Sequence, residues 1–264
     1  YNVKNLSIVK HIETGYKAAS FVVSDGKSKF FVKRYHPKRS SERLLEVHRV
    51  KTFFNEHGVS TIPPLLNSEG STLSNINGDF FAVFPYIPDK QYYGLPSTKA
   101  VASAGENLAR LHLAGANNLS LVNKFLKPWD KQAFLEDATR MLELADAGTT
   151  SFDKMARKML ALKITLAKNS KVSFEDLGLK NDTILHGDYH TQNLFFDEND
   201  RVSYTFDFER TMIGPRTTDV ANGLFMIGFD FTNEIKNAVS PVHFERAHSF
   251  IRAYNEVHPM RQDE

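Results

Sequence analysis

The first third of the chain alternates short apolar runs with polar turns, which is the pattern of an antiparallel sheet. Strands are predicted over residues 6–11, 21–23 and 30–35. Asp25-Gly26 separates the second strand from the third and is typical of a tight hairpin turn. Three such strands in succession predict a β-meander at the start of the fold.

A helix is predicted next, over residues 40–57. Ser40 is a good N-cap residue, and Gly58 follows the last position with helical periodicity. Beyond this helix, residues 64–87 predict two more strands that meet at the turn Asn77-Gly78-Asp79. The apolar residues of the predicted helix mark its buried face: Leu44, Val47, Val50, Phe53 and Phe54.

From Ser97 onward the pattern becomes mainly helical. A hairpin interrupts it, in which NLFFD pairs with RVSYTFDF across the turn Glu198-Asn199-Asp200. The sequence therefore predicts an α+β fold with two lobes: a small antiparallel β N-lobe, residues 1–86, and a larger, mostly helical C-lobe, residues 87–264. The helices are predicted over residues 97–116, 129–147, 151–169, 217–229 and 241–257.

The composition is that of a globular protein with a substantial core, since 41% of the 264 residues are hydrophobic and 21 are Phe. The formal net charge of +2 lacks the basic excess of a nucleic-acid binder. The absence of cysteine excludes disulfides, thiolate–zinc sites and cysteine nucleophiles. The sequence shows neither an apolar run of membrane-spanning length nor the apolar core of a signal peptide, so we expect a cytoplasmic protein without a membrane partner.

The chemistry is concentrated between residues 183 and 210, in the motifs HGDYHTQN and FDFE. The predicted hairpin lies between these motifs, so the carboxylates of Asp188 and Asp207 should project from one end of it. Asn193 lies five positions after Asp188, which suits the two ends of one short loop. The oxygens of Asn193 and Asp207 are good Mg²⁺ ligands, which leaves Asp188 free to act as a base toward a substrate hydroxyl.

Lys33 lies in the otherwise apolar third strand and has two interpretations. It is either an outward-facing lysine of an edge strand or a phosphate-binding lysine anchored on a sheet. A glutamate on the following helix would hold a phosphate-binding lysine in place. With a base and a metal-binding pair, these are the parts of a kinase-type phosphoryl-transfer site.

Taken together, the motifs resemble those of the aminoglycoside phosphotransferase and choline kinase-like family of small-molecule kinases. HGDYHTQN followed by DFE is similar to the family's signature, with Gly187 and Glu209 where protein kinases have Arg and Gly. SAGENLARLH, residues 103–112, and GPRTTDVA, residues 214–221, are similar to two further family segments. The resemblance covers about residues 6–254 and implies a bilobal, protein-kinase-like fold.

The resemblance also implies the reaction, which is the ATP- and Mg²⁺-dependent transfer of the γ-phosphoryl group to a small-molecule hydroxyl. Asp188 would be the catalytic base, and Asn193 and Asp207 would hold Mg²⁺. Lys33 would bind the α- and β-phosphates, with Glu46 as its ion-pair partner. The other cofactor-binding positions would be the nucleotide-covering turn at Gly15 and the backbone that receives adenine at Pro85, Tyr86 and Ile87.

Further residues of the motifs are expected to support this site. Glu209 would be a metal-shell or positioning residue, Asp219 would brace the catalytic loop, and His186 would be a structural hydrogen-bonding residue. The nucleotide-covering turn has one glycine in place of a glycine-rich array, so Lys17 and Ser20 are either phosphate contacts or surface residues. The segment TMIG that follows Glu209 leaves little space for an activation segment.

Three alternatives stay open. A metallohydrolase would use His186, Asp188 and His190, which alternate on one strand face, but it leaves Lys33 and Asp207 unexplained. A kinase fold without activity would serve as a binding module, although the base and the metal-binding residues are all present. A protein kinase is the third alternative, and the missing activation segment counts against it.

The motifs do not specify the acceptor. Family candidates include amino alcohols such as choline, homoserine, thiamine, methylthioribose and aminoglycosides. Acidic residues of the helix predicted over 129–147 would either line a pocket for a cationic acceptor, together with aromatic residues, or be exposed carboxylates. The residues of this predicted pocket are Glu136, Asp137, Glu143, Asp146, Trp129, Tyr92 and Tyr93.

Overall fold

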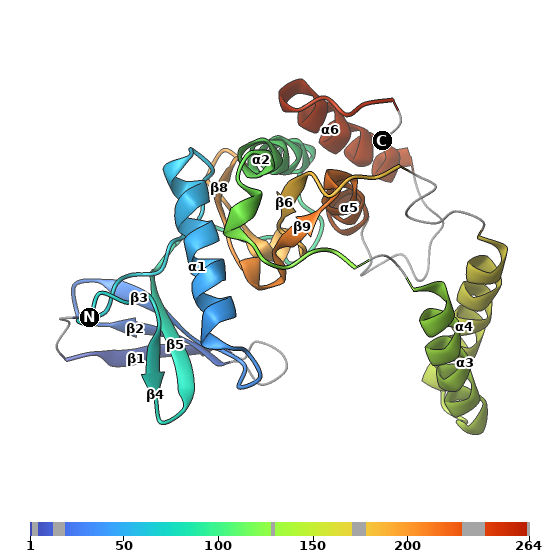
Figure 1. Cartoon of the computed structure of the whole chain (residues 1–264), viewed down its shortest axis with the longest axis horizontal. Helices are drawn as coiled ribbons and strands as arrows, with labels where there is room; N and C mark the ends of the chain where they lie inside the picture. Colours follow the sequence, from blue (N-terminus) through green and yellow to red (C-terminus); the bar gives the residue numbers. More distant parts are fainter. Residues whose placement is uncertain (2–4, 13–18, 128–129, 171–177, 229–240, 263–264) are drawn as a thin grey trace. The chain divides into compact units, whose positions relative to one another are not determined.

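A computed structural model describes residues 1, 5–12, 19–127, 130–170, 178–228 and 241–262, with no side-chain description at 241–243. Its elements are shown in Figure 1. The chain forms two compact units: one comprises Tyr1–Phe125 and Asn181–Gln262, and the other comprises Leu126–Lys180. No helix among the described residues combines the length and apolar character needed to cross a membrane.

The first unit begins with a five-stranded antiparallel sheet in the order β1-β2-β3-β5-β4 (Figure 1). The predicted meander and its hairpin turn are confirmed. In the turn, the Asp25 carboxylate accepts hydrogen bonds from the backbone N–H groups of Lys27 and Ser28, at 2.9 and 2.7 Å. The strands are β1 Ser7–Ile12, β2 Ala19–Ser24, β3 Lys29–Arg34, β4 Ser74–Ile76 and β5 Asp79–Pro85.

Strand β3 lies between β2 and β5, so Lys33 occupies the interior of the sheet. It pairs with Ser20 on one side and with Ala82 on the other. Lys33 is only 7% exposed. The interpretation of this lysine as an outward-facing edge residue is therefore wrong, and its ammonium group has to find partners inside the protein.

Helix α1 (Ser41–Glu56) follows the meander, as predicted. The Ser40 hydroxyl caps it by accepting a hydrogen bond from the Arg43 N–H at 3.3 Å. Gly58, with a φ of 77°, follows its end, because glycine adopts a left-handed conformation without a Cβ clash. The helix buries several apolar residues: Leu44, Val47, Val50 and Phe54.

The rest of the first unit is mainly helical and contains two small two-stranded sheets. The predicted hairpin is β7 (Leu194–Phe196) with β8 (Val202–Thr205). The second pair, β6 (Thr183–Leu185) with β9 (Met212–Gly214), was not predicted, because three-residue strands carry too little periodicity. The helices are α2 Thr98–Ala116, α5 Arg216–Gly223 and α6 Pro241–Val257, with a π-helical turn Leu224–Gly228 after α5 and 3₁₀ turns Leu119–Leu121, Thr191–Asn193 and Phe208–Arg210.

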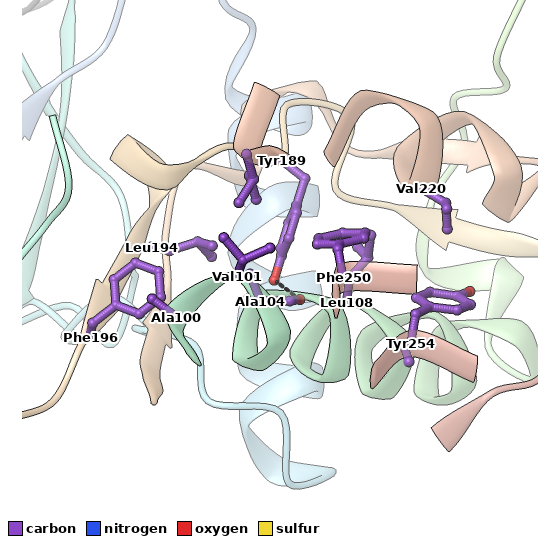
Figure 2. Packing of buried hydrophobic residues seen from close by; sticks show 12 residues of the cluster. Ala100, Val101, Ala104, Leu108, Tyr189, Leu194, Phe196, Val220, Phe250 and Tyr254 are labelled. Atoms are coloured by element: carbon purple, nitrogen blue, oxygen red, sulfur yellow. Dashed lines mark hydrogen bonds between the residues drawn. The ribbon is translucent and has the colours of Figure 1, made fainter. Parts of the chain in front are cut away.

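Figure 2 shows a core of this unit, where α2 and α6 pack against the chain that carries the HGDYHTQN motif. Tyr189 of that motif is fully buried and donates a hydrogen bond to the Ala104 carbonyl oxygen of α2 at 2.8 Å. The side chains of Phe250 and Tyr254 on α6 are fully buried in the same cluster. Burial of Tyr189 thus fixes the backbone on which Asp188 is carried.

The second unit is a pair of packed helices, α3 (Lys131–Ala147) and α4 (Ser151–Asn169). Both were predicted, although α3 begins after Asp130, whose side chain caps it, and Trp129 lies outside the described residues. Thr150 and Asp153 form a capping box at the start of α4, which satisfies backbone N–H groups reciprocally.

The contact between α2 and α6 depends on Gly105. A Cβ at this position would overlap the Phe250 carbonyl oxygen, which belongs to the backbone and cannot move aside cheaply. We expect Gly105→Ala to lower the free energy of unfolding by roughly 1–3 kcal/mol or more, measured by urea denaturation. Gly94→Ala is the matched control, since no atom lies within 4 Å of its Cβ position, and its effect should stay within about 0.5 kcal/mol. Equal stability of the two variants would contradict this account of the contact.

Candidate active site

The base of the β7–β8 hairpin brings Asn193 and Asp207 together. Asn193 lies immediately before β7 and Asp207 lies two residues after β8. The Phe206 N–H donates a hydrogen bond to the Asn193 carbonyl oxygen at 2.8 Å, which ties the two ends together. Asp207 has a left-handed conformation, with φ 59° and ψ 65°, which is a strained conformation often found at functional sites.

Asp188 lies at the same end of the hairpin, as predicted. Its carbonyl oxygen accepts a hydrogen bond from the Asn193 side-chain nitrogen at 2.9 Å. Its carboxylate lies 3.6 Å from Arg210 Nη1 and 3.9 Å from His190 Nε2, and it is about one-third exposed. The backbone of Asp188 is therefore held, while its carboxylate remains accessible to a ligand.

His186 and Asp219 hold the loop that carries Asp188. The Asp219 carboxylate accepts hydrogen bonds from the backbone N–H groups of His186 and Gly187, at 2.6 and 3.0 Å. His186 Nε2 donates to the Phe206 carbonyl oxygen at 2.8 Å, while its Nδ1 accepts from the Asp188 N–H at 3.2 Å. Burial lowers the pKa of His186. The bracing role expected for Asp219 is confirmed.

This arrangement also bears on the metallohydrolase alternative. Both ring nitrogens of the fully buried His186 already have hydrogen-bond partners within the protein. No group of three or more His, Cys, Asp or Glu residues suited to holding a metal ion occurs among the described residues. A site with His186 as a metal ligand is therefore not supported.

The backbone conformation and the space at position 187 explain why this motif has a glycine where protein kinases have an arginine. Its φ is +80°, which is unfavourable for residues with a Cβ. A Cβ would also overlap the carbonyl oxygen of Arg210. The close approach of the two backbones places Arg210 next to the Asp188 loop.

Lys33 is bound by the two carboxylates of the FDFE motif. Its Nζ lies 3.1 Å from Asp207 Oδ1 and also forms an ion pair with Glu209. Burial alone would lower the pKa of Lys33, but the charges of Asp207 and Glu209 outweigh this and raise it. Burial alone would likewise raise the pKa of Asp207, and the charges of Lys33 and Lys51 keep it below its usual range.

The expected ion pair between Lys33 and Glu46 is not formed, because Lys33 pairs with Asp207 and Glu209 instead. Glu46 forms an ion pair with Arg43 of the same helix and accepts a hydrogen bond from the Asn123 N–H at 3.1 Å. Besides burial, the charge of Lys33 contributes to lowering the pKa of two other α1 side chains, His48 and Lys51. With 100° per residue, those positions lie roughly 200° and 140° around the helix from Glu46, so Glu46 is on another face.

Lys51 is a buried cation that the sequence interpretation missed. Its Nζ lies 4.5 Å from the ring centroid of Phe84 and 5.2 Å from that of Phe206. Lys51 is 3% exposed, and burial, followed by the charge of Lys33, lowers its pKa to about 7. Lys51 lies seven residues after Leu44 and four after Val47, and this helical spacing places it on the buried face of α1. That spacing was the signal in the sequence that could have identified it.

A pocket of about 380 Å³ lies beside these groups. Asn193 and Asp207 line it, and so do the three positions expected to receive adenine, Pro85, Tyr86 and Ile87. An apolar pocket with a few polar groups is typical of a cofactor site. Its apolar walls include Val22, Phe31, Ile62, Phe84, Phe195 and Phe206.

The donor atoms suit a hard divalent cation. Asn193 uses its side-chain nitrogen toward the Asp188 carbonyl and His190, which leaves its side-chain oxygen as a donor. Asp207 contributes a carboxylate that lines the same pocket. Mg²⁺ typically takes one or two protein oxygens and fills its other positions with water and phosphate, so this donor set fits it.

For several other expected positions, the described residues show no part in the site. Gly15 and Lys17 lie outside the described residues, and Ser20 is buried in β2. The acidic residues of α3 belong to the second unit. Asp137 and Asp146 form ion pairs with Arg140 and Arg157 there, which favours their interpretation as surface carboxylates. Tyr93 lines the pocket of about 380 Å³, whereas Tyr92 packs against the core.

The fold and this site define a kinase-type phosphotransferase. The chain belongs to the phosphotransferase enzyme family, whose model matches residues 8–256. It is thus a small-molecule kinase, and the family resemblance inferred from the motifs is confirmed.

Curated relatives include two homoserine kinases. The enzyme of Methylobacillus glycogenes is 23% identical over an alignment that covers all of this chain and 75% of the relative. That of Caulobacter sp. (strain K31) is 24% identical over 79% of this chain. The alignment spans 61% of the length of the Caulobacter enzyme.

Solved structures confirm the protein-kinase-like α+β fold. A spectinomycin phosphotransferase in complex with ADP and spectinomycin has a TM-score of 0.69 at 16% identity, over 94% of this chain and 74% of that chain. A microcompartment-associated aminopropanol kinase has a TM-score of 0.68 at 13% identity, over 100% of this chain and 79% of that chain.

The buried ammonium group of Lys51 predicts a pH effect on stability. Its pKa is near 7 in the folded chain and near 10.5 when solvated, so the unfolded state binds more protons between these values. The contribution of Lys51 to the free energy of unfolding should therefore rise with pH in this window, by at most about 1.4 kcal/mol per pH unit.

Urea denaturation of the wild type and Lys51→Met at pH 7, 8 and 9 measures this effect. The stability difference between them should shift in favour of the wild type as the pH rises. Lys99→Met removes an exposed lysine and should track the wild type. A pH-independent difference for Lys51→Met would contradict the assignment.

Proposed function

We propose that this chain transfers the γ-phosphoryl group of ATP to a hydroxyl of a small molecule, with Asp188 as the base. The observation that supports this most directly is the convergence of Asp188, Asn193, Asp207 and Lys33 at one end of a hairpin. These groups come from three separate parts of the sequence, the strand β3, the HGDYHTQN motif and the FDFE motif, and Asn193 and Asp207 line the neighbouring apolar pocket. Such a set matches the parts that phosphoryl transfer requires.

In this proposal Asp188 receives the proton of the acceptor hydroxyl. The acceptor oxygen forms a bond to the γ-phosphorus, and the bond from that phosphorus to the β–γ bridging oxygen breaks, which releases ADP. The partial exposure of the Asp188 carboxylate lets an acceptor reach it, while its hydrogen-bonded backbone fixes its direction. Catalysis is then mainly positioning together with neutralisation of charge.

The nucleotide and the metal ion use the other residues. Asn193 and Asp207 would hold Mg²⁺, which neutralises phosphate charge when bound. Lys33, 3.1 Å from Asp207, would contact the same phosphates. Adenine would lie against Pro85, Tyr86 and Ile87, the turn at Gly15 would cover the phosphates, and lobes 1–86 and 87–264 would enclose the nucleotide.

The acceptor is a hydroxyl compound whose candidates follow from the relatives. Two of these are named homoserine kinases, and two proteins of similar fold are named for spectinomycin and aminopropanol. These names give three acceptor chemistries: an amino acid, an amino alcohol and an antibiotic. An assay of ADP release with each acceptor, in the presence of Mg-ATP, tests the proposed function.

Asp188→Ala should lower the transfer rate by roughly 100- to 10,000-fold, because the acceptor hydroxyl loses its base. Its affinity for Mg-ATP, measured by calorimetry, should stay close to that of the wild type. Glu198→Ala removes an exposed carboxylate from the turn of the same hairpin and serves as the control. An unchanged turnover rate in Asp188→Ala would rule out this base.

Asp207→Ala should weaken Mg-ATP binding itself, by roughly 100-fold or more, because loss of even an outer-shell partner of a metal typically costs about 10- to 100-fold. The Lys33–Glu209 ion pair remains in this variant, so the fold should persist. Calorimetric titration with Mg-ATP measures the change, and thermal melting checks the fold. Wild-type affinity for Mg-ATP would refute the metal-binding role.

A further inference from the structure

Four cations gather along the segment that follows Asp207. Arg210 belongs to this segment and lies beside Asp188, while Arg39, Arg43 and Lys124 contact Glu209, Thr211 and Ile213 of the same segment. The positive charges of these three arginines act on Lys124 and, after burial, are the main causes that lower the pKa of its ammonium group. The four cations therefore lie close enough together to repel one another.

Backbone contacts fix the position of Lys124 in this group. The Ile213 N–H of β9 donates a hydrogen bond to the Lys124 carbonyl oxygen at 2.7 Å. Phe125 forms a parallel bridge with Ile213. Since Arg210 lies three residues before Ile213, the segment with Lys124 runs beside the chain that leaves the FDFE motif.

The three arginines have carboxylate partners. Arg39 Nε lies 3.4 Å from Glu209, and Arg43 pairs with Glu46. Arg210 lies 3.6 Å from Asp188, beyond ordinary hydrogen-bond length, and its side chain is 66% exposed.

Lys124 forms no ion pair among the described residues and is exposed. Among the described residues, this group of cations thus contains Lys124, which has no ion-pair partner there, and Arg210, which is weakly engaged beside Asp188.

We propose that the acceptor carries an anionic group, a carboxylate within a few bonds of its reactive hydroxyl, and that Lys124 and Arg210 bind this group. The inference rests on the proposed function, because Asp188 defines where the hydroxyl lies. An acceptor of this kind places its negative charge next to Arg210, whereas a polycationic acceptor meets repulsion there. The substrate class is a small hydroxy acid, such as a hydroxy amino acid.

Nucleotide phosphates are the other anions that these cations could address. Lys33 is the cation that lies beside Asp207, and it approaches the metal-binding end of the site from β3. Arg210 instead lies beside the Asp188 carboxylate, and Lys124 is within reach of the charge of Arg210. The two assignments differ in which KM changes when Lys124 is removed.

The experiment compares acceptors that differ in the carboxylate alone. L-homoserine is paired with its amide, which keeps the hydroxyl and the amino group, and 3-hydroxypropanoate is paired with 1,3-propanediol. Aminopropanol and spectinomycin complete the panel. The carboxylate member of each productive pair should have a kcat/KM roughly 10- to 100-fold higher, as a charge-assisted hydrogen bond provides. Raising the ionic strength should reduce this ratio.

Lys124→Ala should raise the KM of the carboxylate acceptor roughly tenfold or more and leave the KM of Mg-ATP and of the uncharged partner unchanged. Lys124→Arg should restore most of the loss, and Arg210→Ala should reduce the same preference. Lys99→Ala, which removes an exposed lysine at the start of α2, is the control and should match the wild type. Melting temperatures verify that each variant is folded.

The outcomes separate the two proposals. Transfer to carboxylate acceptors with the Lys124 dependence described supports both. Transfer only to neutral or cationic acceptors overturns the anionic acceptor and leaves the kinase function standing. A rise in the KM of Mg-ATP alone in Lys124→Ala assigns this lysine to the nucleotide and overturns the inference. No Mg-ATP-dependent transfer to any acceptor overturns the proposed function and this inference with it.

Discussion

The arrangement of the site depends on a buried cluster of charges, Lys33 with Asp207 and Glu209. Lys33 comes from the middle of the sheet, whereas both carboxylates follow the β7–β8 hairpin. Removing an ammonium group from water is costly, and loss of one partner of a buried pair typically destabilises by several kcal/mol. The cluster therefore contributes specificity more than net stability, because Lys33 is satisfied only when the sheet and the hairpin meet in this arrangement.

A second constraint is the set of hydrogen bonds beneath Asp188. Asp219, His186 and Asn193 each bond to backbone atoms of the loop or of the neighbouring strand. Asp219 and His186 are almost fully buried, and Asn193 is 7% exposed. Such a loop is rigid before any ligand arrives, which is the condition under which positioning lowers a reaction barrier.

Most of the fold follows from local patterns in the sequence. Helices and the meander were predicted because their apolar periodicity extends over many residues, and the hairpin was predicted because its turn is polar and short. The β6–β9 pair and the carboxylate partners of Lys33 were not predicted. Three-residue strands leave no periodic signal. The apolar pattern predicts the buried face of α1 with Val47, Val50 and Phe54, but it does not show which distant carboxylates Lys33 meets, because those contacts join segments far apart in the sequence.

The way in which α1 packs explains the role of Glu209. Arg43 donates to the backbone carbonyls of Glu209 and Thr211 while it pairs with Glu46, so Glu46 helps to join α1 to the segment after Asp207. Lys33 must then take its second carboxylate from elsewhere, and Glu209 lies two residues beyond Asp207 and supplies it. The glycine that protein kinases have at this position could not do so. The packing of α1 thus accounts for two features together: Glu46 points away from Lys33, and Glu209 takes its place as the second carboxylate partner of Lys33.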